Sequence, residues 1–446
     1  MFIPFVTQSA PQQYSNQRLV NYFPRAIPDG NGAVALIGRG GLTTVAEPGN
    51  NLRRVVEMGG ALYTVSTGNV WRFDGVNAVN VGTVIASDQV SMASSGQEVA
   101  IVTGGRYYLC NGAVTTEYAT GAVTDPQWVT FQDGYFLVSG TIGTRKDALT
   151  ISGLDDGTTF DALEFTFAEN APDEIRGLVS DHGRVWAFGA STTQVFWNNG
   201  AADFPFTPSK SETIERGCLS GATVAKEDNS VFWVGPDKVV YRSGGGVPTV
   251  ISTREVEEDL ARSTIESCFV FQDRGHKFYG IRRTGDTTWC YDITTGLWAE
   301  RSTGLLYAPW AVTDTAIRAG VQYFVTDSGK ICTSSPDVFT DDGEAILAEA
   351  VSKPVYAPPG QDYLTINSLF ISVATGAPLA TTPQIVLQTS RNGLEWGVER
   401  WRSLPQTGEY EKSVHWEGLG SFKKRVQVRF RITDPVKRDL YGVQYV

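Results

Sequence analysis

Short runs of alternating apolar and polar residues, each ending at glycine, recur along most of the chain. VWRFDG at residues 70–75 is one example, and RYYLCNG at 106–112, TQVFWNNG at 193–200 and KVVYRSGGG at 238–246 have the same form. A period of two predicts β-strands with one buried face, and glycine readily adopts the positive φ angles of tight hairpin turns. With 47 glycines, 20 prolines and few long helical patterns, the chain is predicted to be all-β.

These runs belong to a longer repeat, in which an apolar alternation, a turn and an aromatic-rich alternation follow one another. Seven such units begin about 37 to 49 residues apart, at 59–75, 96–114, 133–153, 182–200, 227–246, 274–300 and 319–335. This period matches a four-stranded propeller blade of roughly 40–50 residues, two strands of which each unit would supply. One blade cannot bury its own faces, so its side chains pack on the neighbouring blades. We therefore expect a β-propeller of about seven blades over residues 46–343, with six or eight left open.

The two ends of the chain lie outside the repeat. Residues 1–35 are polar and contain several prolines without strand alternation, so an extended N-terminal arm is predicted over residues 1–45. The repeat stops after about residue 343, and a Pro-Pro-Gly break at 358–360 is typical of a linker. Long alternating stretches follow. They predict a C-terminal β-rich module over residues 344–446, either a β-sandwich or a sheet leaning against the propeller.

Composition supports a large core and excludes some kinds of partner. Of the 446 residues, 41% are hydrophobic and 11% aromatic, which suits a large repeat architecture with an appended module. The net charge of −11 argues against adhesion of the whole surface to nucleic acid. The N-terminus lacks the pattern of a signal peptide, and no apolar run approaches the roughly 18 residues of a membrane span. We expect a protein made in a cytoplasm, without membrane insertion.

Cysteine and histidine are too few and too scattered for a metal centre or a disulfide framework. The five cysteines form no CxxC pair, and only three histidines occur in the chain. Most of the cysteines stand beside aromatic or β-branched residues, as in Trp289-Cys290-Tyr291, so buried reduced thiols are expected. No metal and no cofactor is predicted.

Signatures of catalysis are also missing. The chain has no GxSxG, Walker A or HExxH motif, and GRGGLT at 38–43 lacks the third glycine of a dinucleotide fingerprint. TSRNGLEW at 389–396 resembles a shortened Asp-box, the structural hairpin turn of sialidase-type propellers, with Asn392 in place of aspartate. No pair of carboxylates stands out by its spacing. The chain is therefore predicted not to be an enzyme, and no catalytic residue is assigned.

An acidic stretch at 153–174 is the first candidate binding surface. It carries seven acidic residues and no basic one. A calcium loop would place oxygen ligands at alternating positions, but two of the aspartates are adjacent and the EF-hand spacing fails. We interpret the stretch either as a solvated loop or as a surface that meets a basic partner. The candidate interface residues are Asp155, Asp156, Asp161 and Glu164.

The C-terminal stretch 421–446 is the second candidate surface, because its charge is opposite to that of the whole chain. It holds seven basic and two acidic residues, a net charge of +5. Apolar residues alternate with Gln, Arg and Thr over 426–433, which predicts a strand with a core face and a cationic face. The cationic face is either a solvated surface or a contact with an acidic subunit or a DNA backbone. The candidate subunit-interface or DNA-facing residues are Lys423, Lys424, Arg425, Arg429, Arg431, Lys437 and Arg438.

Three blocks of sequence carry a family resemblance. They are YSNQRLVNYFPRAIP with ALIGRGGLTTVAE near the N-terminus, the block from ALTISG to FWNNG at 148–200, and VHWEGLGSFKKRVQVRFRITDPVKRDLYGVQYV at the C-terminus. The blocks resemble the packaged-DNA stabilisation proteins, or tail-hub and nozzle proteins, of short-tailed bacteriophages. The resemblance implies a structural virion component with a β-propeller, made and assembled in the cytoplasm of the bacterial host. It also implies a ring, typically a homo-hexamer, below the portal and its adaptor ring, which extends the DNA channel and stabilises the packaged DNA until ejection.

A ring of this kind suggests how the two candidate surfaces are used. If subunits join side by side, the basic C-terminal face would meet an acidic surface such as 153–174 of the next subunit, and changing Arg429 and Arg431 to glutamate should impair assembly. The expected partners are further copies of the chain, the portal and adaptor ring, other tail proteins and transiently passing double-stranded DNA. An acidic majority suits a channel wall that must not grip DNA.

Two other functions stay open at the level of sequence. A glycan-cleaving tail protein would hold a cleft of carboxylates and tyrosines at the mouth of the propeller. A propeller that binds a host receptor would expose an aromatic patch, for which Trp396 and Trp401 are candidates that could equally lie in the core.

Overall fold

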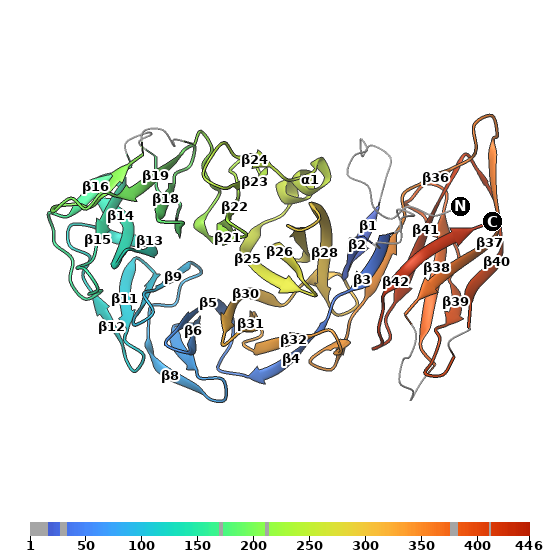
Figure 1. The fold of residues 1–446 in the computed structure, drawn as a ribbon, viewed down its shortest axis with the longest axis horizontal. Coiled ribbons are helices and arrows are strands. Elements are labelled where there is room, and N and C mark those ends of the chain that lie inside the picture. The colour runs from blue at the N-terminus through green and yellow to red at the C-terminus, as the bar shows by residue number, and fades with distance from the viewer. Residues whose placement is uncertain (1–16, 27–33, 169–172, 210–213, 375–381, 410–411) are drawn as a thin grey trace.

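The strands form a ring of blades with a two-sheet module beside it (Figure 1). The computed structural model describes residues 17–26, 34–168, 173–209, 214–374, 382–409 and 412–446. In the view of Figure 1 the ring fills the left and centre, and the C-terminal strands stand at the right. The predicted all-β class, a propeller with a C-terminal β-sandwich, is confirmed.

Seven four-stranded blades make up the ring in the described part of the chain. Blades one and two are β5 (Leu52–Met58), β6 (Ala61–Ser66), β7 (Asn69–Phe73) and β8 (Ala78–Thr83), then β9 (Val90–Ser94), β10 (Val99–Thr103), β11 (Arg106–Cys110) and β12 (Thr115–Tyr118). Blades three and four are β13 (Thr124–Gln132), β14 (Tyr135–Ile142), β15 (Arg145–Ile151) and β16 (Phe165–Phe167), then β17 (Gly177–Asp181), β18 (Arg184–Phe188), β19 (Thr193–Asn198) and β20 (Phe206–Pro208).

Blades five to seven complete the ring. Blades five and six are β21 (Ala225–Glu227), β22 (Ser230–Val234), β23 (Val240–Ser243) and β24 (Thr249–Val250), then β25 (Ile265–Asp273), β26 (His276–Arg283), β27 (Asp286–Asp292) and β28 (Leu297–Thr303). Blade seven is β30 (Val312–Arg318), β31 (Val321–Thr326), β32 (Ile331–Ser335) and β4 (Gly41–Ala46). Each of the seven predicted units covers the two middle strands of one blade, so the expected number of blades is confirmed.

An N-terminal strand closes the ring. β4 pairs antiparallel with β32, with Thr44 opposite Cys332, and so becomes the outer strand of a blade whose other strands come from residues 312–335. The inner strands of neighbouring blades lie in contact, and the inner strand β30 of blade seven contacts the inner strand β5 of blade one. Because the first and last strands share a blade, opening the ring requires breaking a β-ladder.

Side chains on the inner strands bond to the backbone of neighbouring blades. The Thr313 hydroxyl donates to the Leu52 carbonyl at 2.6 Å between blades seven and one. The Ser267 hydroxyl donates to the Thr313 carbonyl at 3.1 Å between blades six and seven. The Lys226 ammonium donates to the Ser180 carbonyl at 2.7 Å between blades five and four. These bonds satisfy backbone groups on the free edges of the inner strands.

The N-terminal segment, predicted to be an extended arm without strand alternation, differs from that expectation. Its described part forms β1 (Arg18–Val20), β2 (Tyr22–Ala26) and β3 (Val34–Gly38) before β4. β2 and β3 show no alternation because they are covered on both sides, Tyr22 packing into the sandwich core and Phe23 into the propeller. Residues 1–16 and 27–33 of the predicted arm lie outside the described residues, and the domain boundaries at 45 and 343 stay predictions.

The C-terminal module is a sandwich of two sheets that are linked to the propeller. One sheet runs β2-β3-β42-β37-β40, and the other continues the blade-six sheet through β28-β1-β35-β41-β38-β39. The additional strands are β29 (Ala308–Pro309), β33 (Thr340–Asp341), β34 (Glu344–Ala345), β35 (Ala348–Val351), β36 (Val355–Tyr356), β37 (Tyr363–Val373), β38 (Gln384–Ser390), β39 (Arg400–Ser403), β40 (Val414–Lys423), β41 (Arg425–Ile432) and β42 (Leu440–Tyr445). The predicted core face of β41 is confirmed, because Val426, Val428, Phe430 and Ile432 are buried between the sheets.

Among the described residues, one α-helix occurs, between blades five and six. α1 (Arg254–Arg262) turns Val256 and Leu260 into the core, and Glu255 and Glu257 stand in its first turn. Within the described ranges, no helix is long and apolar enough to span a membrane.

Candidate assembly surface

The seven basic residues predicted as one surface fall in three places. The connection from β40 to β41 holds Lys423, Lys424 and Arg425. The outward face of β41 holds Arg429 and Arg431, and the loop before β42 holds Lys437 and Arg438. β41 is 8 residues long, about 26 Å at roughly 3.3 Å per residue. The first and last groups therefore stand at opposite ends of a strand and do not form a single patch.

The two arginines on β41 are engaged within the chain. Nε of Arg429 donates to the side-chain oxygen of Gln388 at 3.1 Å, and its guanidinium lies 4.3 Å from the ring centre of Trp396. Arg431 forms an ion pair with Glu399. Both arginines therefore already have side-chain partners within the same molecule.

The Asp-box-like stretch at 389–396, which ends at Trp396, forms a turn. The side-chain oxygen of Asn392 accepts backbone N–H bonds from Leu394 and Glu395, both at 2.9 Å. A hollow of about 450 Å³ lies beside this loop, and Glu395 is the single carboxylate among its lining residues. Glycoside hydrolysis ordinarily uses two carboxylates, so this hollow does not hold the pair that a glycan-cleaving function would need.

Arg438 differs from the prediction of a surface residue. It is 2% exposed, and its guanidinium donates to the carbonyl oxygens of Phe339 and Ile346 at 3.1 and 3.4 Å. Burial, assisted by nearby Arg39, lowers the pKa of Arg438 to about 10. Next to it, Asp439 accepts the Gly38 N–H at 2.9 Å. The Arg274 guanidinium of blade six donates to Asp439 at 3.1 Å, so this part of the loop joins the sandwich to the propeller.

The basic residues that present charge most openly stand where the chain crosses from β40, in one sheet of the sandwich, to β41, in the other sheet. Lys423 and Lys424 are exposed, and Arg425 is half-buried. Lys424 is the single residue between the two strands, and its φ of 65° lies in the left-handed region. We call these three residues the basic tip.

The acidic stretch forms a loop between β15 and β16 in blade three. Asp155 and Asp161 are exposed, whereas Asp156 binds its own loop by accepting from the Thr158 hydroxyl and backbone N–H, bonds that lower its pKa. Burial, with the charge of Asp161, raises the pKa of half-buried Glu164. Residues 169–172 of the predicted stretch lie outside the described residues. Among the described residues, no group of three or more His, Cys, Asp or Glu side chains could hold a metal ion.

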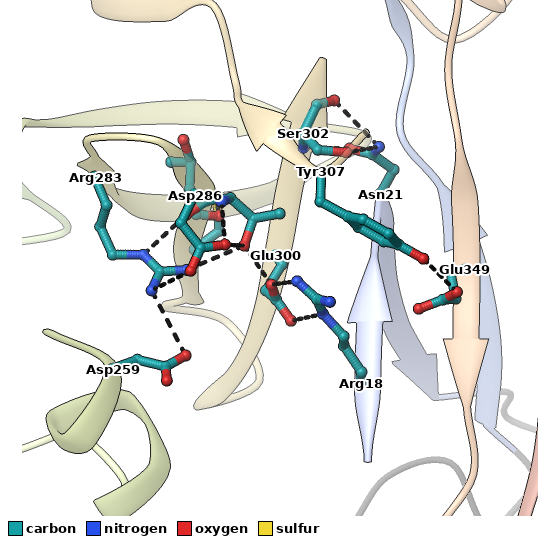
Figure 2. A network of polar contacts seen from close by, with 12 residues as sticks. Arg18, Asn21, Asp259, Arg283, Asp286, Glu300, Ser302, Tyr307 and Glu349 are labelled. Atoms are coloured by element: carbon teal, nitrogen blue, oxygen red, sulfur yellow. Dashed lines mark hydrogen bonds and ion pairs between the residues drawn. The ribbon is translucent and has the colours of Figure 1, made fainter. Parts of the chain in front are cut away.

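A chain of polar contacts joins the propeller to the sandwich (Figure 2). The Arg18 guanidinium on β1 donates to both carboxylate oxygens of Glu300 on β28, at 2.7 and 2.6 Å. The same guanidinium lies 4.7 Å from the ring centre of Tyr307, whose hydroxyl donates to Glu349 on β35 at 2.7 Å. Arg429 stands 3.9 Å beyond Glu349. The contacts therefore run from blade six across β1 and β35 to β41.

Blade six and the N-terminal strands extend the network on both sides. The Asn21 amide donates to the Ser302 hydroxyl at 2.9 Å, as Figure 2 shows. Arg283 stands 3.2 Å from Asp286 and 3.6 Å from Asp259 of α1. Such a satisfied, largely buried network fixes one arrangement of the two parts.

Charge is distributed unequally between the two parts of the chain. Residues 1–343 hold 25 Lys and Arg against 38 Asp and Glu, a net charge of −13, whereas residues 344–446 hold 12 against 10, a net charge of +2. In Figure 1, β15 and β16 with the acidic loop lie at the left end, and β37 and β40 lie at the right end. One molecule thus carries its acidic loop and its basic tip at opposite ends.

Of the two aromatic surface candidates named from the sequence, Trp401 is exposed and Trp396 is half-buried, but three further aromatics on the sandwich surface were missed. Tyr363, Phe370 and Tyr441 are exposed on strands whose alternate residues are buried. The signal was an aromatic residue at a polar position of the alternation, as in LTINSLFISV. The junction network was also missed, because Arg18 and Glu300 are 282 residues apart along the chain.

Two family models together match most of the chain. The model described as Bacteriophage P22 Gp10, beta-propeller, matches residues 3–331, and the model described as Bacteriophage P22 Gp10, beta-sandwich, matches residues 355–445. No curated protein sequence matches the chain significantly.

Three solved structures with low sequence identity are similar to this chain. The computationally designed Ika8 protein is 13% identical with a TM-score of 0.41, over 72% of this chain and 100% of that one. The RRP9 WD40 repeats are 9% identical with a TM-score of 0.45, over 67% and 99% of the two chains. BamB from Moraxella catarrhalis is 12% identical with a TM-score of 0.41, over 74% and 97%.

A propeller followed by a sandwich, both matched by models of one phage protein, defines a structural component of a bacteriophage tail. The chain belongs to the P22 Gp10 family, the packaged-DNA stabilisation or tail-hub proteins of short-tailed phages.

Proposed function

We propose that copies of this chain form a closed ring in the virion tail, below the portal and its adaptor ring. The ring extends the DNA channel and holds the packaged genome until ejection. It is assembled in the bacterial cytoplasm, and it contacts the adaptor and other tail proteins. Six copies are expected from the family resemblance. The chain acts as a structural part and not as an enzyme.

The observation that carries this proposal is the separation of opposite charges on one molecule. The acidic loop with Asp155 and Asp161 lies at one end, and the basic tip with Lys423 and Lys424 lies at the other (Figure 1). Surfaces of opposite charge on opposite ends favour head-to-tail association of identical copies. Repeated head-to-tail contacts generate a ring when the rotation between copies closes.

Further support comes from the stiffness of the molecule. The propeller is closed by a β-ladder, and the buried network around Arg18 and Glu300 ties it to the sandwich. A part that must resist the pressure of packaged DNA benefits from having few internal degrees of freedom. The acidic propeller, with a net charge of −13 over residues 1–343, suits a wall that DNA has to slide past.

The structure indicates that residues other than Arg429 and Arg431 should be changed to test the contact between copies. Arg429 and Arg431 bond to Gln388 and Glu399 of the same chain. Replacing these arginines by glutamate would therefore disturb the sandwich itself. Lys423 and Lys424 are exposed at the connection between β40 and β41, so reversing their charge should have little effect on folding.

A nonsense mutant of this gene in its phage tests the function. We expect capsids that package DNA and then lose it, measured as DNA content of purified heads, with full content restored in a suppressor host. Heads that keep their DNA but fail to adsorb to cells would contradict the proposal and favour a receptor-binding or glycan-cleaving tail protein.

A further inference from the structure

Exposed aromatic side chains are concentrated in the sandwich. Of the six exposed Phe, Tyr and Trp residues in the described part of the chain, five lie between residues 356 and 441 and one, Trp197, lies in the propeller. The five are Tyr356, Tyr363, Phe370, Trp401 and Tyr441. Aromatic residues are enriched at the centres of protein interfaces, where they provide much of the binding energy. The sandwich is therefore the part of the molecule that most resembles an interface.

Three of these aromatics share one face of one sheet. Tyr363 and Phe370 on β37 and Tyr441 on β42 point outward, because Leu364, Leu369 and Ile371 on β37 and Leu440 and Val443 on β42 fill the inner face. The Phe370 ring stacks on His415 of β40, with 5.4 Å between ring centres. We call this outer surface of β42, β37 and β40 the aromatic face.

The aromatic face carries little charge. Its other exposed positions include Thr365, Ser372, Ser421 and Gln444, and its charged residues are Glu417 and Lys423. Depletion of charge with retention of aromatic residues is the composition of an interface core rather than of a solvated sheet.

The outer side of this sheet packs against the propeller at the other edge, on β2 and β3. Leu36 of β3 pairs with Leu440 of β42, and both point into the sandwich, so Ile37 and Tyr441 belong to the opposite side. On β2 and β3 that side is covered by the propeller, where Phe23 and Ile37 pack in one cluster with Trp310. On β42, β37 and β40 no described residue covers that side, and Tyr363, Phe370 and Tyr441 are exposed there. One half of this sheet surface is therefore covered by the propeller, and the other half is accessible to a partner.

The size of the aromatic face limits what can cover it. Its longest strands are 11 and 10 residues. At about 3.3 Å per residue and about 4.8 Å between strands, three strands present roughly 450 Å². A standard interface takes about 800 Å² from each partner. The partner must therefore also contact a neighbouring element, and the basic tip adjoins the face, since Tyr363 pairs with Lys423.

The acidic loop, residues 152–164 between β15 and β16, is chemically complementary to the aromatic face and the basic tip. Two of its exposed residues are leucines, Leu154 at 62% and Leu163 at 85% exposed, and they stand close in sequence to exposed Asp155 and Asp161. Leucines flanked by carboxylates match aromatics flanked by a basic tip, both in apolar contact and in charge. Because the loop and the face lie at opposite ends of one molecule (Figure 1), they meet only between copies.

We infer that the aromatic face and basic tip of one copy receive the acidic loop of the next copy. Phe370 and Tyr363 contact the two leucines, and Lys423 and Lys424 pair with the two aspartates. This contact rests on the proposed ring and identifies the surfaces that build it. It joins two different surfaces, so it is heterologous, as a ring requires.

Cross-linking in intact virions tests the contact directly. The experiment uses phage that carry Leu163→Cys together with Tyr363→Cys, treated with a short bismaleimide and analysed by denaturing electrophoresis. The five natural cysteines are all buried, and burial raises the thiol pKa of Cys268 and Cys290 to about 12, so they should not react. A matched control combines Leu163→Cys with Trp401→Cys, an exposed aromatic outside the aromatic face.

The expected result is a ladder of cross-linked multimers from the Tyr363 pair, at least tenfold stronger than from the Trp401 pair. Virions that contain the chain, retain DNA and infect cells, but give no ladder or an equal ladder from the control pair, would overturn this contact while leaving the proposed ring in place. Absence of the unaltered chain from purified parent virions would instead contradict the proposed function itself.

A charge exchange provides an independent readout. Lys423→Glu with Lys424→Glu should reduce the cross-linked ladder at least tenfold, and so should Asp155→Lys with Asp161→Lys in a separate variant. Combining all four changes in one chain should restore the ladder, because the pairing is re-formed with reversed signs. Thermal unfolding of each purified variant identifies any loss caused by misfolding. Failure of the combination to recover, with unchanged melting temperature, would overturn the inferred pairing.

Discussion

At the scale of single residues, the ion pair between Arg18 and Glu300 ties the N-terminal strand to blade six. Glu300 is 4% exposed, and it receives two bonds from Arg18 and one from the Thr287 hydroxyl. Removing one partner of such a pair is costly, since the other charge is left buried and unpaired. Replacing Arg18 by alanine should therefore lower the free energy of unfolding by about 2–3 kcal/mol, measured by urea denaturation.

A surface pair of the same type is the control for this change. Arg254 bonds to Glu258 at 2.8 Å on α1, but both side chains are largely exposed. Arg254→Ala should cost less than about 0.5 kcal/mol. Equal losses in the two variants would contradict the role assigned to the junction.

The acidic side of the same junction should make stability depend on pH. Burial, followed by the negative charges of Glu300 and Asp259, raises the pKa of Glu255 from 4.5 to about 7. Between these two values the folded state binds a proton that the unfolded chain has released, so the free energy of unfolding falls as pH rises. Glu255→Gln should raise stability by about 1–2 kcal/mol near pH 8 and change it little near pH 4.5. Melting temperatures that shift equally at both pH values would contradict this assignment.

The exposure of the charged residues was predictable only where it depends on neighbours in sequence, and their role at an interface stays a prediction. The exposed acids Asp155 and Asp161 and the basic tip were identifiable because runs of like charge are local. Burial of Arg438 and pairing of Arg431 with Glu399 were not, since their partners come from distant strands. A sequence shows which residues are charged. Packing against distant strands determines which of these residues are exposed to a partner.

At the scale of elements, closure of the ring depends on how closely β4 fits between its neighbours. A Cβ atom added to Gly41 would stand 2.1 Å from the carbonyl oxygen of Thr340, closer than any side chain can lie to backbone. Gly41→Ala should therefore push β4 away and cost about 2 kcal/mol. We expect faster cleavage between β4 and β5 in limited proteolysis, together with a lower urea midpoint.

Gly246 offers a matched control, because a Cβ atom there meets no atom within 4 Å and its φ is not in the left-handed region. Gly246→Ala should leave both measurements within about 0.5 kcal/mol of the parent protein. Equal sensitivity of the two glycine variants would show that β4 does not control closure.

The blades were predictable as elements, whereas the N-terminal strands were not. Each blade repeats a local hairpin pattern, such as that of 59–75, which can be read without knowing its neighbours. β2 and β3 are buried on both faces by segments hundreds of residues away, so their sequences lack the alternation that marks a strand. The pairing of β4 with β32 was also not predictable, because the two strands lie far apart in the sequence.

At the scale of the whole molecule, the charge distribution predicts weak contact with DNA. The propeller part carries a net charge of −13, and phosphate binding depends on released counterions at basic sites. The purified chain should show no binding to double-stranded DNA tighter than about 10 μM at roughly 150 mM salt, measured by fluorescence anisotropy. Tight, strongly salt-dependent binding would contradict a channel wall that lets DNA pass.

The position of the chain in the virion can be observed in a cryo-electron microscopy map of the tail that is resolved well enough to place strands. We predict a closed ring of copies around the DNA channel, next to the adaptor, with the sandwich of each copy against the propeller of the next. A chain found only at the distal tip or on peripheral fibres, without a closed ring around DNA, would contradict the proposed function.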